Sequence, residues 1–136
     1  MLQNVKEIQF KVNGDARGKL VVAEGKKDIP FNIARVFYIY GADKKSVRGC
    51  HANRKSEFVF INICGSSRVK ITDGHDEAIY LLDKPYKGIY IPKMIWKEMY
   101  DFSRDAVLLV LSSEPYDAME YIREYKEYIK EANANE

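Results

Sequence analysis

The sequence predicts an all-β sandwich or small barrel that is followed by one C-terminal α-helix. Ten Tyr and six Phe favour strands, because aromatic and β-branched side chains suit a pleated, half-buried surface. Gly and Pro separate the short apolar runs at close spacings, which is typical of antiparallel sandwiches and barrels. Asp73-Gly74 adds a hairpin signal between two such runs.

The expected strands are short runs in which apolar residues alternate or cluster. The first contains the alternating residues Ile8, Phe10 and Val12 and ends at the turn-forming residues 13–15. The other expected strands span residues 19–23, 34–40, 58–64, 68–72, 78–82, 88–91 and 106–112.

The C-terminal segment changes to a helical period. Met119, Ile122 and Ile129 recur at helical spacing, so we expect a helix at about residues 117–132. Asp117 lies where an N-cap is expected, and Glu120 follows it at the capping-box distance.

Length and charge restrict the class of protein. The 136 residues fit one domain spanning 1–136, and a net charge of +2 argues against a nucleic-acid binder. The longest apolar run, residues 107–111, is too short to cross a membrane, and the start has no apolar signal core, so we expect a cytoplasmic protein. Cys50 and Cys64 lie in strand-like runs, where we expect reduced core or near-core thiols.

Histidine is scarce, which makes His51 a candidate catalytic group. The chain has only His51 and His75, and His75 follows the Asp73-Gly74 turn, where a solvated hairpin tip is expected. If residues 47–53 form a strand, alternation places His51 and Asn53 on one face. The alternative is that His51 is a satisfied core or rim imidazole.

The same segment resembles the metal signature of cupin barrels, G-x-H-x-H with a Glu and a later P-x-G-x-x-H. In this chain Asn53 and Lys97 occupy the positions of two of the histidines of the signature, and Glu57 is the residue that matches its Glu. Asn is a poor transition-metal ligand and a protonated Lys is none, so we expect a cupin without a metal and without a cofactor.

A further resemblance depends on an ordered set of short segments, which are residues 15–20, 29–31, 35–39, 48–52, 96–103, 116–117 and 121–125. Through these segments nearly the whole chain resembles the WxcM-like sugar-nucleotide 3,4-ketoisomerases of bacterial cell-surface sugar synthesis, which act on dTDP-4-keto-6-deoxyglucose. Such enzymes read R-G-x-H-A-H and W-H-E-M with a Gln near position 58, whereas this chain has Asn53, Lys97 and Phe58 at those places.

The resemblance implies a cupin-type jelly roll or β-barrel and an isomerase that moves a ketone from carbon 4 to carbon 3 through an enediolate. His51 is then the proton carrier, Tyr38 or Asn53 a hydroxyl-proton relay or orienting group, and Arg48 or Lys97 the enediolate stabiliser. Lys97 is a second acid or base if burial lowers its pKa. The loss of the second imidazole puts the turnover rate in question, and Asn53→His is expected to raise it.

Binding a dTDP-sugar requires cations and flat rings. Arg17 and Arg35 are candidates for the diphosphate, although Arg35 has a structural ion pair as its alternative. Trp96 and Tyr90 are candidates for stacking, with a core role as the alternative for both. The resemblance also implies a galacto product, because Arg17 lies where the galacto and gluco groups of the family differ, and a homodimer built through the N-terminal strands.

Two other functions remain open at this point. One is a 3,5-epimerase of the same fold, which typically uses a His with an Asp partner. The other is a weakly active or inactive sugar-nucleotide binding module, which Asn53 favours.

Overall fold

The computed structural model describes residues 2–134, and nearly all of its regular structure is antiparallel β-sheet. The elements in chain order are η1 (Leu2–Asn4), β1 (Lys6–Gln9), β2 (Val12–Asp15), β3 (Gly18–Val21), β4 (Arg35–Tyr40), β5 (Arg48–Asn53), β6 (Phe58–Cys64), β7 (Ser67–Thr72), β8 (Glu77–Leu82), β9 (Lys87–Ile91), β10 (Trp96–Tyr100), β11 (Val107–Ser112), η2 (Ala118–Glu120), β12 (Tyr121–Ile122) and α1 (Tyr125–Ala134).

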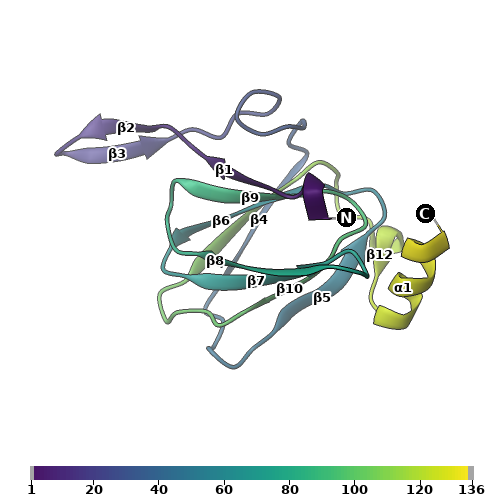
Figure 1. Ribbon diagram of the computed structural model, residues 1–136. Helices are drawn as coiled ribbons and strands as arrows, with labels where there is room; N and C mark the ends of the chain where they lie inside the picture. The colour runs from purple at the N-terminus through teal and green to yellow at the C-terminus, as the bar shows by residue number, and fades with distance from the viewer. Residues whose placement is uncertain (1, 135–136) are drawn as a thin grey trace.

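Two five-stranded sheets form the body of the molecule. Their strand orders are β1-β9-β6-β11-β4 and β12-β5-β10-β7-β8, and the hairpin β2–β3 pairs only with itself. Figure 1 shows the sheets as two layers, with the hairpin projecting away on the side opposite α1 and β12. The all-β prediction with a C-terminal helix is confirmed, and the sheets form an open two-layer jelly roll rather than a closed barrel.

The core lies between the layers and continues on both outer faces. Phe58 and Phe60 of β6 point between the sheets, whereas Val59 and Ile61 of the same strand point outward under Ile29 and Phe31. Both faces of β6 are therefore buried over residues 58–61, which explains why that part of the strand is continuously apolar.

The C-terminal helix begins later than the sequence predicts. The predicted start at 117 is wrong, since α1 spans Tyr125–Ala134 and Asp117 instead caps the 3-10 turn η2 by accepting from the Met119 N–H at 2.9 Å. Tyr121 and Ile122 pair with β5, so sheet hydrogen bonds replace helical ones there.

Three further expectations need correction. The first turn lies at residues 16–17 rather than 13–15, because Asn13 and Gly14 pair with Leu20 and Lys19. β10 was absent from the expected strands. Cys50 and Cys64 are free but exposed, so their predicted core or near-core position is wrong.

Within the described residues, no helix is both long and apolar enough to span a membrane.

Candidate active site

A β-bulge places His51 directly opposite Lys97. Lys97 of β10 pairs with His51 of β5, while the next residue, Glu98, pairs with Gly49, so Cys50 is the extra residue. Gly49 and Cys50 have φ values of 84° and 56°, in the left-handed region that such a bulge requires. Residues directly opposite in an antiparallel pair share a face of the sheet, so His51 and Lys97 lie on the same side.

That side is the interior between the two sheets. Lys97 is 1% exposed, and its Nζ lies 4.7 Å from the ring centroid of Phe58, a core residue. Its ammonium group donates to the Asn53 Oδ1 at 3.0 Å and to the Ile95 carbonyl at 3.4 Å. Burial lowers the pKa of Lys97 to about 7, although the negative charge of Glu120 acts in the opposite direction.

The imidazole of His51 is held neutral at physiological pH. Burial, followed by the positive charge of Lys97, lowers the pKa of His51 to about 4, against a backbone hydrogen bond involving Gly49 that acts in the opposite direction. The ring packs at 4.8 Å between centroids against Tyr121 of β12. A neutral imidazole facing a lysine of near-neutral pKa gives the site one base and one acid at pH 6 to 7.

Arg35 brings a positive charge, with no carboxylate paired to it among the described residues, to the Tyr121 ring that packs against His51. Its Nη1 donates to the Tyr121 hydroxyl at 3.2 Å and its Nη2 to the Ser112 hydroxyl at 3.3 Å. The guanidinium also lies over the rings of Phe37 and Tyr116, at 5.1 and 5.6 Å. Among the described residues no carboxylate pairs with Arg35, and its Nε is buried without a hydrogen-bond partner. An anion therefore has a cation available to it, and the alternative of a structural ion pair is not observed.

Glu120 is a site residue that sequence analysis did not find. It is 4% exposed, and its carboxylate accepts hydrogen bonds from the N–H groups of Lys55 and Ser56, both at 2.9 Å, and from the Ser56 hydroxyl. Burial alone would raise the pKa of Glu120, but these hydrogen bonds outweigh it and hold the pKa below its ordinary value. The spacing pattern showed only a capping-box residue, because nothing in it reveals that loop amides would surround the carboxylate.

Tyr38 lies away from this site. Arg35, Phe37 and Ile39 of β4 point inward, so Tyr38 points outward and is 61% exposed, with its ring beside Tyr40. In this chain it is not placed to relay a proton to or from His51, and that part of the sequence-based assignment is corrected.

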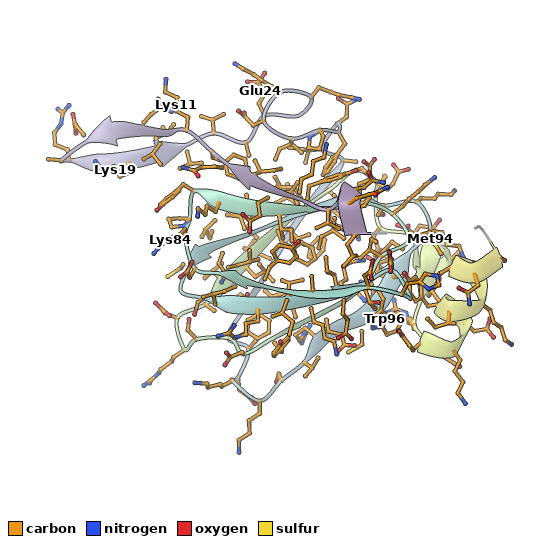
Figure 2. All side chains as sticks on the ribbon, in the orientation of Figure 1. Lys11, Lys19, Glu24, Lys84, Met94 and Trp96 are labelled. Atoms are coloured by element: carbon orange, nitrogen blue, oxygen red, sulfur yellow. The ribbon has the colours of Figure 1, made fainter. Side chains whose placement is uncertain are left out.

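Trp96 and Tyr90 are also outside the site. Trp96 precedes Lys97 in β10 and therefore points to the outer face, where it is buried beside α1, against Tyr125 and Tyr128 (Figure 2). Tyr90 lies on the outer face of the other sheet, where its hydroxyl donates to Glu57. Trp96 is therefore a core residue, which was the alternative to a stacking role. Tyr90 lines a separate cavity of about 490 Å³.

The remaining two candidate arginines are exposed. Arg48 begins β5, three residues before His51. Arg17 lies at the tip of the β2–β3 hairpin, where its 91% exposed side chain pairs with Asp15 at 2.6 Å. Within one chain this hairpin projects away from the strands that carry His51 and Tyr121 (Figure 1).

Two observations concern ligands. Within residues 2–134, no group of three or more His, Cys, Asp or Glu side chains converges on a point where a metal ion would be held. A cavity of about 250 Å³ opens at the Glu120 end of the site, and its lining residues are Lys55, Glu114, Pro115, Tyr116, Asp117 and Glu120.

A two-sheet jelly roll with an acid–base pair between its layers defines a cupin-like protein suited to proton transfer on an anionic ligand. The chain belongs to the FdtA family, described as WxcM-like, C-terminal, whose model matches residues 3–133.

Named relatives of known activity agree with this membership. The TDP-4-oxo-6-deoxy-α-D-glucose-3,4-oxoisomerase of Aneurinibacillus thermoaerophilus is 44% identical over 131 residues, which is 94% of each chain. The crystal structure of QdtA, a sugar 3,4-ketoisomerase from Thermoanaerobacterium thermosaccharolyticum, in complex with TDP, is 45% identical with a TM-score of 0.96 and covers 99% of this chain and 98% of its own. A histidine-to-asparagine variant of QdtA in complex with TDP-4-keto-6-deoxyglucose is 45% identical, with a TM-score of 0.95 and coverages of 98% and 97%.

An epimerase is a more distant neighbour. A double mutant of ChmJ, a 3′-monoepimerase from Streptomyces bikiniensis, is 15% identical with a TM-score of 0.77, over 88% of this chain and 68% of its own. At that identity the likeness concerns the fold alone.

Proposed function

We propose that this protein is a sugar-nucleotide 3,4-ketoisomerase that converts dTDP-4-keto-6-deoxyglucose into a dTDP-3-keto-6-deoxyhexose. The observation that carries the proposal is the neutral imidazole of His51, which faces Lys97 in the interior and packs against Tyr121, whose hydroxyl accepts from the guanidinium of Arg35. The activities named for relatives at 44% and 45% identity supply the substrate class.

The reaction requires two proton transfers on carbon and two on oxygen. A base removes the proton from carbon 3, the C–H electrons form a double bond between carbons 3 and 4, and the former carbonyl oxygen at carbon 4 takes up a proton. The hydroxyl on carbon 3 then loses its proton and becomes the new carbonyl, while carbon 4 is protonated. No oxidant or reductant is consumed, because the sugar is oxidised at carbon 3 and reduced at carbon 4.

The geometry suits His51 for the carbon-bound proton. One imidazole can take the proton from carbon 3 and return it to the neighbouring carbon 4, so a single histidine is sufficient. Stabilising the enediolate between the two steps requires a positive charge or a hydrogen-bond donor, which the Lys97 side chain supplies. Arg48, exposed three residues earlier in the same strand, is a candidate for a further substrate contact.

Nucleotide binding is assigned to the aromatic and cationic end of the site. Arg35 presents a planar guanidinium suited to diphosphate oxygens. The rings of Tyr116 and Tyr121, whose centroids are 5.7 Å apart, offer flat surfaces for the base or the sugar. These two tyrosines take the stacking role that the sequence suggested for Trp96 and Tyr90.

We also propose that each subunit is one domain and that two subunits form a homodimer through the N-terminal strands. β4 is the edge of its sheet, and Val36, Tyr38 and Tyr40 leave an apolar outer face exposed. The hairpin likewise exposes Val12 and Leu20. A hairpin inserted against the partner would carry Arg17 to the partner's site, where it would contact substrate and favour the galacto product.

The proposed setting is the bacterial cytoplasm, in the synthesis of sugars for surface polysaccharides such as the O-antigen of lipopolysaccharide. Exposed free thiols at Cys50 and Cys64 suit a reducing compartment.

The test is incubation with freshly made dTDP-4-keto-6-deoxyglucose in deuterated water, followed by proton NMR. Isomerisation gives a 3-keto product, in which carbon 4 carries either the proton moved from carbon 3 or deuterium from solvent, and the coupling constants at carbon 4 report galacto or gluco configuration. Deuterium at carbon 3 of recovered substrate would show reversible proton removal there. Exchange at carbon 5 would identify an epimerase, and binding with neither a 3-keto product nor exchange would identify a binding module.

A further inference from the structure

Asn53 connects two buried charged side chains. It is 0% exposed, its Oδ1 accepts from Lys97 at 3.0 Å, and its Nδ2 is buried without a hydrogen-bond partner among the described residues. The Asn53 side chain also helps to lower the pKa of the Glu120 carboxyl. Asn53 therefore contacts the Lys97 amine on one side, and its backbone pairs with Tyr121, the residue that follows Glu120.

Backbone pairing fixes Glu120 beside Asn53. Tyr121 pairs with Asn53, and the Arg54 N–H donates to the Glu120 carbonyl at 2.9 Å. These bonds join η2 and β12 to the end of β5, so the carboxylate has little freedom to move. A buried carboxylate is costly unless it is hydrogen-bonded, and here the loop amides of Lys55 and Ser56 meet that cost.

The hydrogen bonds from the loop do not by themselves require a negative charge on the side chain of residue 120. A neutral amide in place of the carboxylate would still accept from the two loop N–H groups. The charge itself favours the ammonium form of Lys97, which burial disfavours.

We infer that Glu120, acting through Asn53, is a positioning residue that holds the Lys97 amine beside His51 as the group that moves the oxygen-bound proton. This inference rests on the proposed isomerase function and assigns the proton that His51 does not carry. Protonated Lys97 gives its proton to the oxygen on carbon 4 while His51 takes the proton from carbon 3. The resulting neutral amine then takes the proton from the hydroxyl on carbon 3 while His51 protonates carbon 4, and both side chains return to their starting states.

This arrangement reverses one expectation from the sequence. Asn53 contacts Lys97 in a fully buried space, so Asn53→His places a larger ring against the amine and disturbs the connection to Glu120. We therefore expect Asn53→His by itself to lower kcat rather than raise it.

The test compares two variants that change charge in opposite directions. Glu120→Gln removes a negative charge near Lys97 and Asn53→Asp adds one, and both keep the side-chain shape. The alkaline limb of the kcat profile should move to lower pH in Glu120→Gln and to higher pH in Asn53→Asp. We expect a displacement of at least about one pH unit in each, and a larger one in Asn53→Asp because the new charge lies at hydrogen-bond distance from the amine. In Glu120→Gln we also expect kcat to fall about tenfold with KM unchanged. Glu124→Gln, which alters an exposed carboxylate four residues later, is the matched control and should leave the profile unchanged.

A second readout does not depend on turnover. The ¹³Cε chemical shift of Lys97, followed by NMR as pH is varied, should show the same opposite displacements of its pKa. The melting temperature distinguishes this role from a purely structural one. If Glu120 were only structural, Glu120→Gln would lower the melting temperature and leave both titrations unchanged. Unchanged titrations, or displacements in the same direction in both variants, would overturn the inference. If the wild-type protein does not isomerise the sugar, the proposed function fails, and the NMR titration still decides whether Glu120 controls Lys97.

Discussion

The imidazole of His51 packs against the ring of Tyr121, with 4.8 Å between the centroids and 59° between the planes. The two residues are 70 positions apart in the chain, yet Tyr121 pairs with Asn53 and so lies beside β5. The Tyr121 hydroxyl accepts a hydrogen bond from Arg35. The C-terminal segment therefore connects the proposed proton carrier to the proposed phosphate-binding cation.

His51→Gln should separate chemistry from binding. If His51 carries the carbon-bound proton, kcat falls by at least about 10²-fold, the effect expected for a general base, while the affinity for dTDP and the melting temperature stay near wild-type values. Calorimetric titration with dTDP and the NMR assay on one preparation provide the measurement. A destabilised but fully active His51→Gln protein would show that the imidazole is only a packing group.

Tyr121→Phe should weaken substrate binding more than it slows the reaction. The substitution keeps the ring against His51 but leaves an Nη of Arg35 without its hydroxyl partner, a loss worth about 1 kcal/mol, or roughly a fivefold rise in KM. Tyr125→Phe, which alters a ring on the outer face of the sheet, is the control. A tenfold drop in kcat at constant KM would contradict this division of roles.

The all-β class, the C-terminal helix and most strands could be predicted from the sequence because their side chains alternate or cluster in the expected way. β10 could not, because Lys97 occupies an interior position and removes the apolar signal there. The helix start was misplaced because Met119 and Ile122 have helical spacing, although Ile122 belongs to a strand and Met119 is exposed.

The site was predictable only in part. His51, Asn53, Lys97 and Arg35 were identified, because scarce or charge-bearing residues in strand-like runs stand out. Tyr38 and Trp96 were misassigned because a one-residue change of face separates the interior from the outer surface. Tyr121 and Glu120 were not found, since their roles depend on the pairing of β12 with β5, which no local pattern reveals.

Lys97→Met should stabilise the fold while abolishing turnover. The pKa of Lys97 is about 7 in the fold and near 10.5 in the unfolded chain, so between these values the unfolded chain binds a proton that the folded chain does not. Wild-type stability therefore rises with pH through this window, and the variant lacks that dependence. The advantage of Lys97→Met in the free energy of unfolding should be about 2 kcal/mol larger at pH 7 than at pH 9, measured by urea denaturation. An equal advantage at both values would mean that Lys97 is protonated in the fold throughout.

Chelation should leave the enzyme unchanged. Asn53 accepts a hydrogen bond from Lys97 at the positions where cupins commonly place imidazole ligands, so an ammonium group occupies the space that a cation would need. Prolonged incubation with a strong chelator, followed by assay and thermal melting, should show no loss of kcat or melting temperature. Loss of activity that one divalent ion restores would contradict this expectation.

The pH dependence of kcat/KM should be a bell that lies to the acid side of neutrality. His51 must be neutral to accept the carbon-bound proton, and its pKa of about 4 places the acid limb there, well below the ordinary value of 6.5. Lys97 must be protonated to donate to the developing oxyanion, so activity falls as the pH rises through its pKa of about 7. Lys97→Arg keeps a positive charge but cannot release a proton at these pH values. It should therefore lower kcat/KM throughout, and the remaining activity should lack the alkaline limb while keeping the acid limb. The measurement is the initial rate at low substrate from pH 4 to 9, with circular dichroism at each pH to confirm folding. A wild-type kcat/KM that does not fall up to pH 9 would show that Lys97 titrates as an ordinary lysine and does not serve as the acid.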